Sequence, residues 1–574
     1  MWAAVALFAA LRCVVIAAAD VPVVAPDEYG SWAMARYLGG HETLLLMQDM
    51  PRYSLISGVV LVPFTWLPVG PVGAYRLSLV ALSLCAVASA FLVRATIRRL
   101  LGDVPLLGAA AFALVLLWPA TLVTGSFTWA EPTVLLWWSS LAWAVVTVWT
   151  GDVARDRDRA LLVGSIVAGL APFVHGRFIA VPLIWIASVL ALVVLRRGRP
   201  DGAPRAGTLV VAGGLLVAGA GVALVADRAA TAAIWTDATS EGIPALLGSV
   251  TSIPMWRSVA VAFAGQTWYV LVSSAGLAIF GVAMLARLAR RGTPGVRAGM
   301  LTLGALLASN LLVSTAVMGV GIHGAVEVTT PTTEIRWDNL VFGRYVDAAT
   351  LVLAVLGVAW LWEPSRRLVP RLAAATGAWA CVAAVLITAY ASNVLAKDII
   401  AAAIAGVSGW SNDRSHLPMA TWTTIGLVAM VLVCATALHG RRTLLCALAL
   451  LATTGCLLSA QVATSVQAEV PPGEVVEALG DAPRPGAIVA VAADAGAVPM
   501  VEYWGFSIQY RLLDEGWQFE YPEVRSDELV DDLRSDAASG TAPEVVALTG
   551  DHAPLGPGWT KAAEFEGVTF WRRA

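Results

Sequence analysis

Long apolar runs separated by short polar segments make up most of the chain. Runs of about 20 apolar residues are long enough to cross the ~30 Å hydrocarbon core of a bilayer as α-helices. The pattern therefore predicts an α-helical polytopic membrane protein with about 13 spans. The predicted spans are 2–19, 73–93, 105–123, 131–149, 160–175, 178–195, 207–226, 259–285, 299–320, 346–362, 372–392, 419–438 and 443–462.

Every second loop between these runs is short and rich in arginine. The arginines are Arg94, Arg98 and Arg99; Arg155, Arg157 and Arg159; Arg196, Arg197, Arg199 and Arg205; Arg287, Arg290, Arg291 and Arg297; Arg366, Arg367 and Arg371; and Arg441 and Arg442. Basic loops remain on the cytoplasmic side of a membrane, so these loops are expected there. The other loops, 20–72, 227–258, 321–345 and 393–418, and the tail from about 463 are then expected outside the cytoplasm.

The first external loop contains two apolar segments that are too short to span a bilayer. They are "EYGSWAMARYL" at 28–38 and "YSLISGVVLVPFTWL" at 53–67. Trp and Tyr favour the headgroup region, and short apolar helices can lie in the membrane plane. Both segments are therefore predicted to be surface helices.

Beyond Ser465 the composition shifts to Pro, Glu, Asp and Gly, which indicates a soluble domain. "AIVAVAA", "EVVALTG" and "KAAEFEGVTFWRR" are predicted strands, the last a hairpin that turns at Glu566–Gly567. "SDELVDDLRSDA" is a predicted helix with Ser526 as its N-cap. The chain is thus divided into a transmembrane domain, 1–464, and a small extracytoplasmic α/β domain, 465–574.

Composition agrees with the membrane assignment. The 574 residues are 58% hydrophobic and 13% charged, against about 25% charged in a soluble protein. A net charge of −3 argues against nucleic acid as a partner. The first run lacks a basic start and a cleavage site, so it is expected to be a retained helix rather than a signal peptide. All six cysteines lie in apolar runs and are expected to be buried hydrophobic residues rather than disulfide or zinc ligands.

Two adjacent acids, Asp27 and Glu28, begin the first of the two short segments. Acids near a bilayer are costly unless they are hydrated, paired or functional. They could simply favour the start of a helix, since carboxylates are stabilising at helix N-termini. Further polar residues at external helix ends favour a functional role. These residues are Arg52, Glu131, His175, Arg177, Arg344 and Tyr345.

Short turns cannot move away from the protein, so these side chains are expected to converge on one external cavity or to pair with each other. Such a set suits sugar transfer from a lipid phosphate. A carboxylate accepts the proton of an attacking hydroxyl, and arginines bind the leaving phosphate bidentately. An apolar groove would hold the lipid chain.

The sequence here resembles the GT-C glycosyltransferases, integral membrane enzymes that use polyprenyl-phosphate sugars. It is most similar to the branch containing protein O-mannosyltransferases, aminoarabinose transferases and actinobacterial relatives. The segments that carry the resemblance are "PDEYGSWAMARYL", "PRYSLISGVVLVPF", "FTWAEPTVLLWW", "HGRF" and "FGRYVD". The motifs are short, and the second half of the membrane region resembles no family that we can name.

The resemblance implies that Asp27 is the general base, and that Glu28 orients the acceptor or helps to bind a metal. It implies a polyprenyl-phosphate sugar donor, an acceptor in the cell envelope (glycan, lipid or protein), and inversion at the anomeric carbon. The reaction would take place at the outer face of the plasma membrane. The metal site is unknown; no cofactor is certain, and a divalent cation is left open.

Simpler explanations exist for several of these residues. Glu131 precedes Pro132 and makes a good helix start, and Arg177 and Arg344 could contact lipid headgroups by snorkelling. Arg12 lies inside the first predicted span and needs a partner or a polar cavity. The alternative function is a transporter or flippase of a lipid-linked sugar, although such proteins usually show broken helices near the midplane and internal symmetry.

Overall fold

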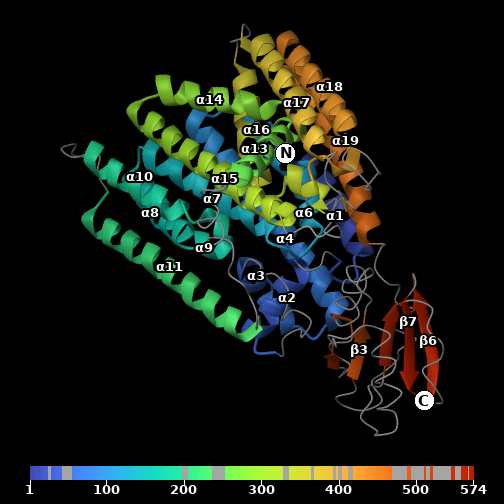
Figure 1. The fold of residues 1–574 in the computed structure, drawn as a ribbon. Coiled ribbons are helices and arrows are strands. Elements are labelled where there is room, and N and C mark those ends of the chain that lie inside the picture. Colours follow the sequence, from blue (N-terminus) through green and yellow to red (C-terminus); the bar gives the residue numbers. More distant parts are fainter. Residues whose placement is uncertain are drawn as a thin grey trace.

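The computed structural model describes most of the helical region and part of the C-terminal region. The described residues are 1–23, 27–41, 55–196, 204–234, 253–327, 335–363, 368–391, 396–397, 404–410, 418–467, 488–492, 510–511, 518–520, 545–549, 558–565 and 568–573. The helices are α1 (Trp2–Ala18), α2 (Asp27–Leu38), α3 (Leu55–Thr65), α4 (Gly70–Leu101), α5 (Pro105–Leu116), α6 (Pro119–Gly125), α7 (Glu131–Thr150), α8 (Ala154–Gly169), α9 (Ala171–Val174), α10 (Val181–Arg196), α11 (Ala206–Ile234), α13 (Ile253–Ser273), α14 (Leu277–Arg291), α15 (Pro294–Glu327), α16 (Asp347–Trp362), α17 (Val369–Ala391), α18 (Met419–His439) and α19 (Arg441–Gln467). Three short 3-10 helices are Gly176–Phe178, Trp337–Val341 and Ser408–Trp410. Figure 1 shows the helices as one block with a small sheet at one end.

Every predicted span contains a helix or a pair of helices, and the chain is a multi-pass membrane protein. Among the described residues, 8 helices are long and apolar enough to cross a membrane, or up to 10 if each bent pair is one span. The prediction of about 13 spans also included α1, α8 and α16, which are shorter helices. The number of spans by length and composition is therefore lower than predicted.

The run 259–285, predicted as one span, is broken. Helices α13 and α14 meet at an angle of 97°. Ala275 (φ 48°) and Gly276 (φ 74°) adopt left-handed backbone conformations at the break, which glycine tolerates without steric cost. The Ser274 hydroxyl accepts the backbone N–H of Ala278 at 3.2 Å and so satisfies one free donor at the start of α14. Hydrophobicity continues through the break, which is why the apolar pattern did not reveal it.

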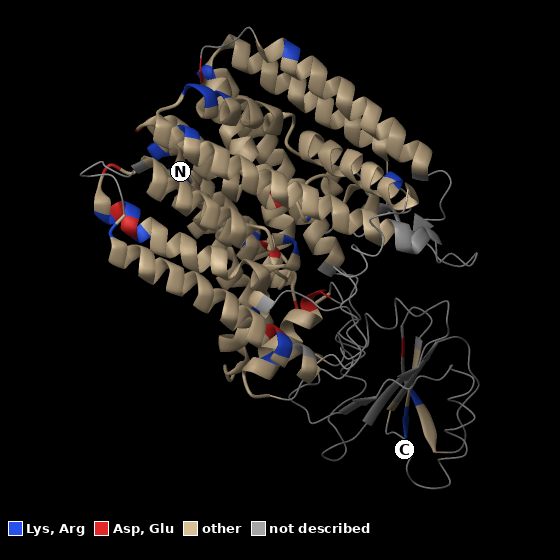
Figure 2. Cartoon of the chain, turned by 60° about the vertical axis from the view of Figure 1, so that its left-hand side comes forward, with Lys and Arg blue, Asp and Glu red and all other residues tan. Residues whose placement is uncertain are grey.

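The arginine-rich loops meet at one end of the helical block. Arg99 pairs with Asp156 at 2.6 Å, joining the end of α4 to the start of α8. Arg287 pairs with Glu363, and Arg441 donates to the carbonyl of Trp362 at 3.1 Å. The alternation of loops thus corresponds to the two ends of the helices. In Figure 2 charged residues are sparse, and they gather at helix ends and in one interior cluster.

Glycine allows a close contact between helices α14 and α16. A Cβ on Gly281 would collide with the carbonyl of Leu353, and one on Gly357 with the carbonyl of Leu277. Small residues let membrane helices approach this closely where lipid offers no hydrophobic driving force. Phe280 and Trp360 stack beside this contact, with ring centroids 5.3 Å apart.

The helix predicted at 28–38 forms as α2, and its aromatic side chains are buried in the protein. Tyr29 and Trp32 have 0% and 2% exposed area, so their rings are inside the protein rather than at headgroup depth. Helix α3 covers α2, and the hydroxyls of Ser31 and Ser57 are 2.7 Å apart. Gly58 makes room for Met34, since a Cβ there would collide with that side chain.

The C-terminal region contains a five-stranded sheet in the order β4-β3-β5-β7-β6. Its strands are β3 (Ile488–Ala492), β4 (Gln518–Glu520), β5 (Val545–Thr549), β6 (Trp559–Phe565) and β7 (Val568–Arg573). β3 runs parallel to β4 and β5, whereas β7 is antiparallel to β5 and β6. The predicted strands and hairpin are confirmed, and β4 was not predicted. The predicted helix at 526–537 lies outside the described residues. A short parallel pair, β1 (Ile335–Arg336) and β2 (Ala396–Lys397), belongs to the external loops.

The cysteines differ in part from the expectation. All six are free thiols, but Cys13, Cys381 and Cys446 are exposed on the apolar helix surfaces rather than buried. A small apolar side chain that faces lipid has the same sequence signature as one in the core, so the apolar run could not distinguish them.

Candidate active site

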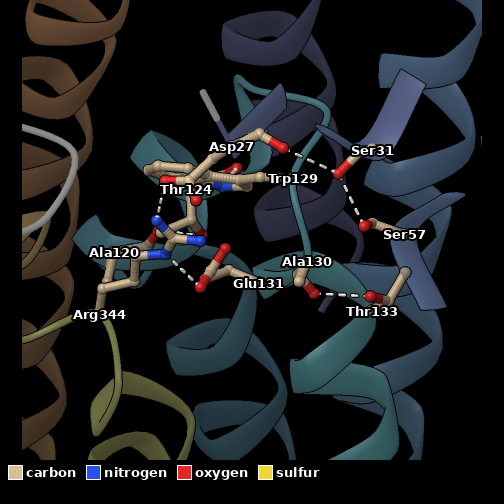
Figure 3. Close-up of polar contacts among 10 residues, drawn as sticks. All are labelled: Asp27, Ser31, Ser57, Ala120, Thr124, Trp129, Ala130, Glu131, Thr133 and Arg344. Carbon is tan, nitrogen blue, oxygen red and sulfur yellow. Dashed lines mark hydrogen bonds and ion pairs between the residues drawn. The ribbon is translucent and has the colours of Figure 1, made fainter. Parts of the chain in front are cut away.

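Arg344 lies between two carboxylates that come from distant parts of the chain. Its guanidinium pairs with Asp27 through Nη1 and with Glu131 through Nε (Figure 3). The side chains of Arg344, Asp27 and Glu131 are only 9%, 17% and 6% exposed. The guanidinium carbon also lies 4.2 Å from the centroid of the Trp129 ring. A cation and two anions are thus assembled in a mostly buried cluster.

The side chains of this cluster are positioned at or just before the first residues of helices. Asp27 is the first residue of α2 and Glu131 the first of α7, where carboxylates also favour the helix dipole. Arg344 lies in the turn before α16, and Gly343 lets that turn pass the Tyr269 ring, which a Cβ would strike. Burial alone would lower the pKa of Arg344, but the carboxylates of Asp27 and Glu131 outweigh it and raise that pKa. Arg344 is therefore permanently charged.

Arg177 is a second buried cation beside this cluster. Its side chain is stacked on Tyr345, with the guanidinium carbon 4.3 Å from the ring centroid, and on Phe178 at 4.9 Å. Arg177 is 3% exposed. Among the residues that the structure describes, its Nε and Nη1 atoms have no hydrogen-bond partner. Buried guanidinium donors without partners are costly, and an anion bound beside them would satisfy them.

His175 is held neutral next to this arginine. Burial, followed by the positive charges of Arg177 and Arg344, lowers the pKa of His175 well below its usual range. Its Nδ1 atom accepts the backbone N–H of Arg177 at 3.3 Å. The His175 ring also meets Tyr345 edge-on, with centroids 5.1 Å apart. Burial likewise raises the pKa of Tyr345, so both rings are neutral.

Glu28 has a different environment from Asp27. Its Oε1 atom accepts from the Tyr75 hydroxyl at 2.9 Å, and from both the backbone N–H and the hydroxyl of Thr128 at 2.5 and 2.9 Å. Its Oε2 atom accepts the N–H of Val23 at 2.8 Å. The side chain is 0% exposed. This geometry suits a residue that ties α2 to the segment before α7; the role in acceptor orientation or metal binding stays a prediction.

Arg12 stabilises the segment before α7 from inside the protein. Its guanidinium donates to the carbonyl of Gly125 at 2.5 Å and to the hydroxyls of Ser126 and Ser83 at 3.0 and 2.8 Å. From the sequence, Arg12 was expected to need a partner or a polar cavity. Within the described chain, Arg12 donates to carbonyls and hydroxyls. These bonds fix the turn that carries Trp129 and Glu131.

Asp347 belongs to the site, although sequence reasoning gave it no role. Its Oδ1 atom accepts the Tyr269 hydroxyl at 2.7 Å, and its Oδ2 atom has no partner among the described residues. The Oε2 atom of Glu131 also lacks one there. Both residues line a small cavity with Arg344. The signal was the motif "FGRYVD", whose last residue starts a helix just after Arg344.

An apolar cavity adjoins the charged one. It has a volume of about 970 Å³ and is lined by side chains of α5, α18 and α19 together with Trp118, which lines both cavities. Trp118 therefore lies between the apolar cavity and the charged cluster. No sequence pattern predicted it, because its lining comes from helices that are far apart in the chain.

The predicted site residues mostly converge. Asp27, Glu131, His175, Arg177, Arg344 and Tyr345 lie in one contact network, and Glu28 adjoins it through α2. Arg52 lies outside the described residues. Within the described part of the chain, no three His, Cys, Asp or Glu side chains are grouped so that they could hold a metal ion.

Comparison with known proteins gives matches to structures only. No family model and no curated protein matches this chain. The structure of ArnT from Cupriavidus metallidurans in the apo state matches with a TM-score of 0.52 and 14% identity, covering 99% of this chain and 97% of ArnT. ArnT bound to undecaprenyl phosphate matches with a TM-score of 0.54 over the same shares of both chains.

The chain has the GT-C fold of ArnT. The resemblance drawn from the sequence motifs is thereby confirmed for the fold. An oligosaccharyltransferase from Archaeoglobus fulgidus also matches, with 11% identity over 95% of this chain and 68% of that one. Its TM-score of 0.34 is too low to support an argument.

Proposed function

We propose that this protein is a membrane glycosyltransferase that transfers a sugar from a polyprenyl-phosphate donor to a cell-envelope acceptor at the outer face of the plasma membrane. The observation that carries the proposal is Arg177, a buried guanidinium with unpartnered Nε and Nη1 atoms in the described structure, next to the Asp27–Arg344–Glu131 cluster. ArnT, which shares the fold, has been solved with undecaprenyl phosphate bound. Supporting the lipid assignment, the apolar cavity of about 970 Å³ meets the charged one at Trp118.

The donor phosphate would bind to Arg177 and Arg344, because guanidinium groups recognise phosphate oxygens bidentately. Two negative charges already balance Arg344. A phosphate that takes over part of this pairing would release the Asp27 carboxylate. Asp27 would then be able to accept a proton, whereas Glu131 would stay paired and keep Arg344 in place. The polyprenyl chain would occupy the apolar cavity.

Transfer then follows from this arrangement. Asp27 accepts the proton of the acceptor hydroxyl, and the hydroxyl oxygen forms a bond to the anomeric carbon of the sugar. The bond from that carbon to the phosphate oxygen breaks on the opposite face, and polyprenyl phosphate leaves with the bonding electrons. The anomeric centre is inverted. Arg177 and Arg344 stabilise the charge that develops on the leaving phosphate.

The test is sugar transfer from a polyprenyl-phosphate donor by the purified full chain, compared with Asp27→Asn at matched expression. Asparagine keeps the shape and the helix start but cannot accept the proton. General-base catalysis contributes about 10²–10⁴-fold, so turnover should fall by about that factor. Binding of undecaprenyl phosphate, measured separately, should remain. Full activity in Asp27→Asn would reject Asp27 as the base, and lipid movement without sugar transfer would favour the alternative, a flippase.

A further inference from the structure

Tyr510 and Arg511 bring the C-terminal region into contact with the candidate site. The Tyr510 ring is 1% exposed and meets Trp32 edge-on, with centroids 5.1 Å apart. It meets Tyr75 in the same way at 6.3 Å, and its hydroxyl donates to the carbonyl of Pro71 at 3.2 Å. Tyr510 thus fills part of the apolar cluster around α2.

The two ring partners of Tyr510 are the residues that hold the acidic end of α2. Tyr75 donates to Glu28, and the Trp32 indole N–H donates to the Thr128 hydroxyl at 3.0 Å. Thr128 in turn donates twice to Glu28. Tyr510 is therefore linked to Glu28 through Tyr75, and to Thr128 through Trp32. Asp27 precedes Glu28, and Trp129 under Arg344 follows Thr128.

Arg511 makes a second contact of the same kind. Its Nη2 atom pairs with Asp20 Oδ2 at 3.1 Å, while Arg76 pairs with Asp20 Oδ1 at 2.8 Å. Arg76 also donates to the carbonyls of Ala19 and Ala17 at 2.8 and 3.1 Å. Asp20 thereby joins the end of α1, the start of α4 and the C-terminal region. Arg76 neighbours Tyr75, so both contacts act on the same turn of α4.

Tyr510 and Arg511 lie between two strands of the sheet in the sequence. Tyr510 and Arg511 belong to the connection between β3 and β4, which are parallel neighbours, so the chain must cross over from one strand to the next. Strands on both sides of this connection are paired in the sheet. The sheet lies beside the α2–α3 end of the helical block in both views (Figures 1 and 2).

We propose that Tyr510 and Arg511 are positioning residues through which the C-terminal domain completes the active site. Tyr510 holds Tyr75 and Trp32, these hold Glu28 and Thr128, and the network fixes the directions of Asp27 and Trp129. The effect on turnover rests on the proposed glycosyltransfer, whereas the effect on α2 does not.

Hydrogen exchange of the full-length protein in nanodiscs measures the effect on α2 separately from the effect on turnover. In Tyr510→Ala, backbone amides of α2 and of residues 126–131 should exchange about tenfold faster than in the wild type, while β5 and β7 keep their protection. Tyr510→Phe keeps the ring contacts and should restore most of the protection. Arg511→Gln should give a smaller increase at α2, since its partner Asp20 is 47% exposed. Lys561→Ala removes an exposed cation of the same sheet and serves as the control.

The companion measurement is sugar transfer and undecaprenyl phosphate binding by the same variants. Turnover in Tyr510→Ala should fall at least about tenfold with lipid affinity unchanged, because Arg177 and the apolar cavity are not displaced. Unchanged exchange at α2 in Tyr510→Ala would overturn the inference, and so would a uniform rise over the whole chain. If the wild type transfers no sugar, the proposed function fails, but the exchange result still decides the positioning role.

Discussion

Two buried arginines of the site have opposite surroundings, although both motifs read Gly-Arg-aromatic. Arg344 is paired with Asp27 and Glu131, whereas the Arg177 side chain is stacked on the faces of Tyr345 and Phe178. Removing one member of a buried ion pair leaves an uncompensated charge and costs about 3–5 kcal/mol. Among the described residues, the Nε and Nη1 atoms of Arg177 have no hydrogen-bond partner, so its removal should leave fewer buried groups unpaired than the removal of Arg344. The two alanine variants should therefore differ in stability, although both arginines are proposed to bind the donor phosphate.

Replacement of each arginine by alanine tests this difference. Both variants should bind undecaprenyl phosphate about 10- to 150-fold more weakly, as expected for a lost charge-assisted hydrogen bond of about 1.5–3 kcal/mol. Arg344→Ala should also lower the unfolding temperature strongly, whereas Arg177→Ala should leave it unchanged or raise it. Lipid titration and thermal unfolding in detergent measure both effects.

Lysine at either position should restore binding only in part, because a point charge replaces a bidentate fork. Exposed Arg98, at the opposite end of α4, provides the control substitution to alanine. Unchanged lipid affinity in both alanine variants would remove these arginines from the phosphate site.

The lowered pKa of His175 predicts that the free energy of unfolding depends on pH. Its folded-state pKa is lowered, while in the unfolded chain it should be about 6.5. Below about pH 6.5, His175 therefore binds a proton in the unfolded state but not in the folded state. The free energy of unfolding is thus highest above about pH 6.5 and decreases as the pH falls. Between about pH 7.5 and about pH 5, the unfolding temperature of His175→Asn should fall less than that of the wild type. Exposed His439→Asn is the control, and an equal fall in His175→Asn and the wild type would contradict the prediction.

At the scale of secondary-structure elements, the 97° break between α13 and α14 turns α14 against α16. This places Leu277 and Gly281 of α14 next to Leu353 and Gly357 of α16. Helix α16 starts with Asp347, three residues after Arg344, so the α14–α16 contact supports the helix next to the site. Close backbone packing of these two helices is therefore expected to be needed for the position of Arg344.

Alanine at Gly281 or Gly357 should force α14 and α16 apart. Each added methyl group would meet backbone carbonyl atoms, and overpacking of this kind costs about 1–3 kcal/mol. Gly213→Ala in α11 is the matched control, because nothing lies within 4 Å of its added Cβ; relative to glycine, alanine should stabilise that helix by about 0.5–1 kcal/mol. Thermal unfolding compares the three variants. Equal unfolding temperatures of Gly281→Ala and Gly213→Ala would refute close packing of α14 against α16.

For the whole molecule, the charged cluster and the apolar cavity lie within the helical block, whereas the sheet reaches the site through Tyr510 and Arg511. Donor binding should therefore depend mainly on the helices. Acceptor use should depend on both parts, because α2 carries Asp27 and packs against Tyr510. The domain boundary predicted at 464 stays a prediction; α19 continues to Gln467.

Removing residues 468–574 should impair transfer to the acceptor more than it impairs donor binding. Undecaprenyl phosphate affinity is expected to stay within about threefold, since its arginines and apolar cavity are retained. Transfer should fall strongly, because Trp32 and Tyr75 lose the ring that covers them. Lipid titration and a transfer assay on the truncated protein make the comparison, and loss of lipid binding with transfer preserved would reverse the assignment.

The sequence by itself determined the helical membrane class, the alternation of loops, most of the strands and the residue types of the site. These follow from local rules: about 20 apolar residues span a bilayer, arginines mark one side, and strands alternate with turns. Charged residues at short external turns predicted a convergence, and Asp27, Glu131, Arg177 and Arg344 do converge. Even the fold could be recognised from short motifs such as "FGRYVD".

Only the tertiary structure decided which of these residues pair with one another. Pairing depends on contacts between residues as distant as Asp27 and Arg344, separated by 317 positions, which no local pattern encodes. The sequence treated Asp27 and Glu28 as one pair, but packing bonds Glu28 to Val23, Tyr75 and Thr128 and leaves Asp27 at the cluster with Arg344. The break at Ala275, the burial of Trp32 and the contact of Tyr510 likewise arise from packing, because an apolar side chain has the same signature whether it faces lipid, a helix or another domain.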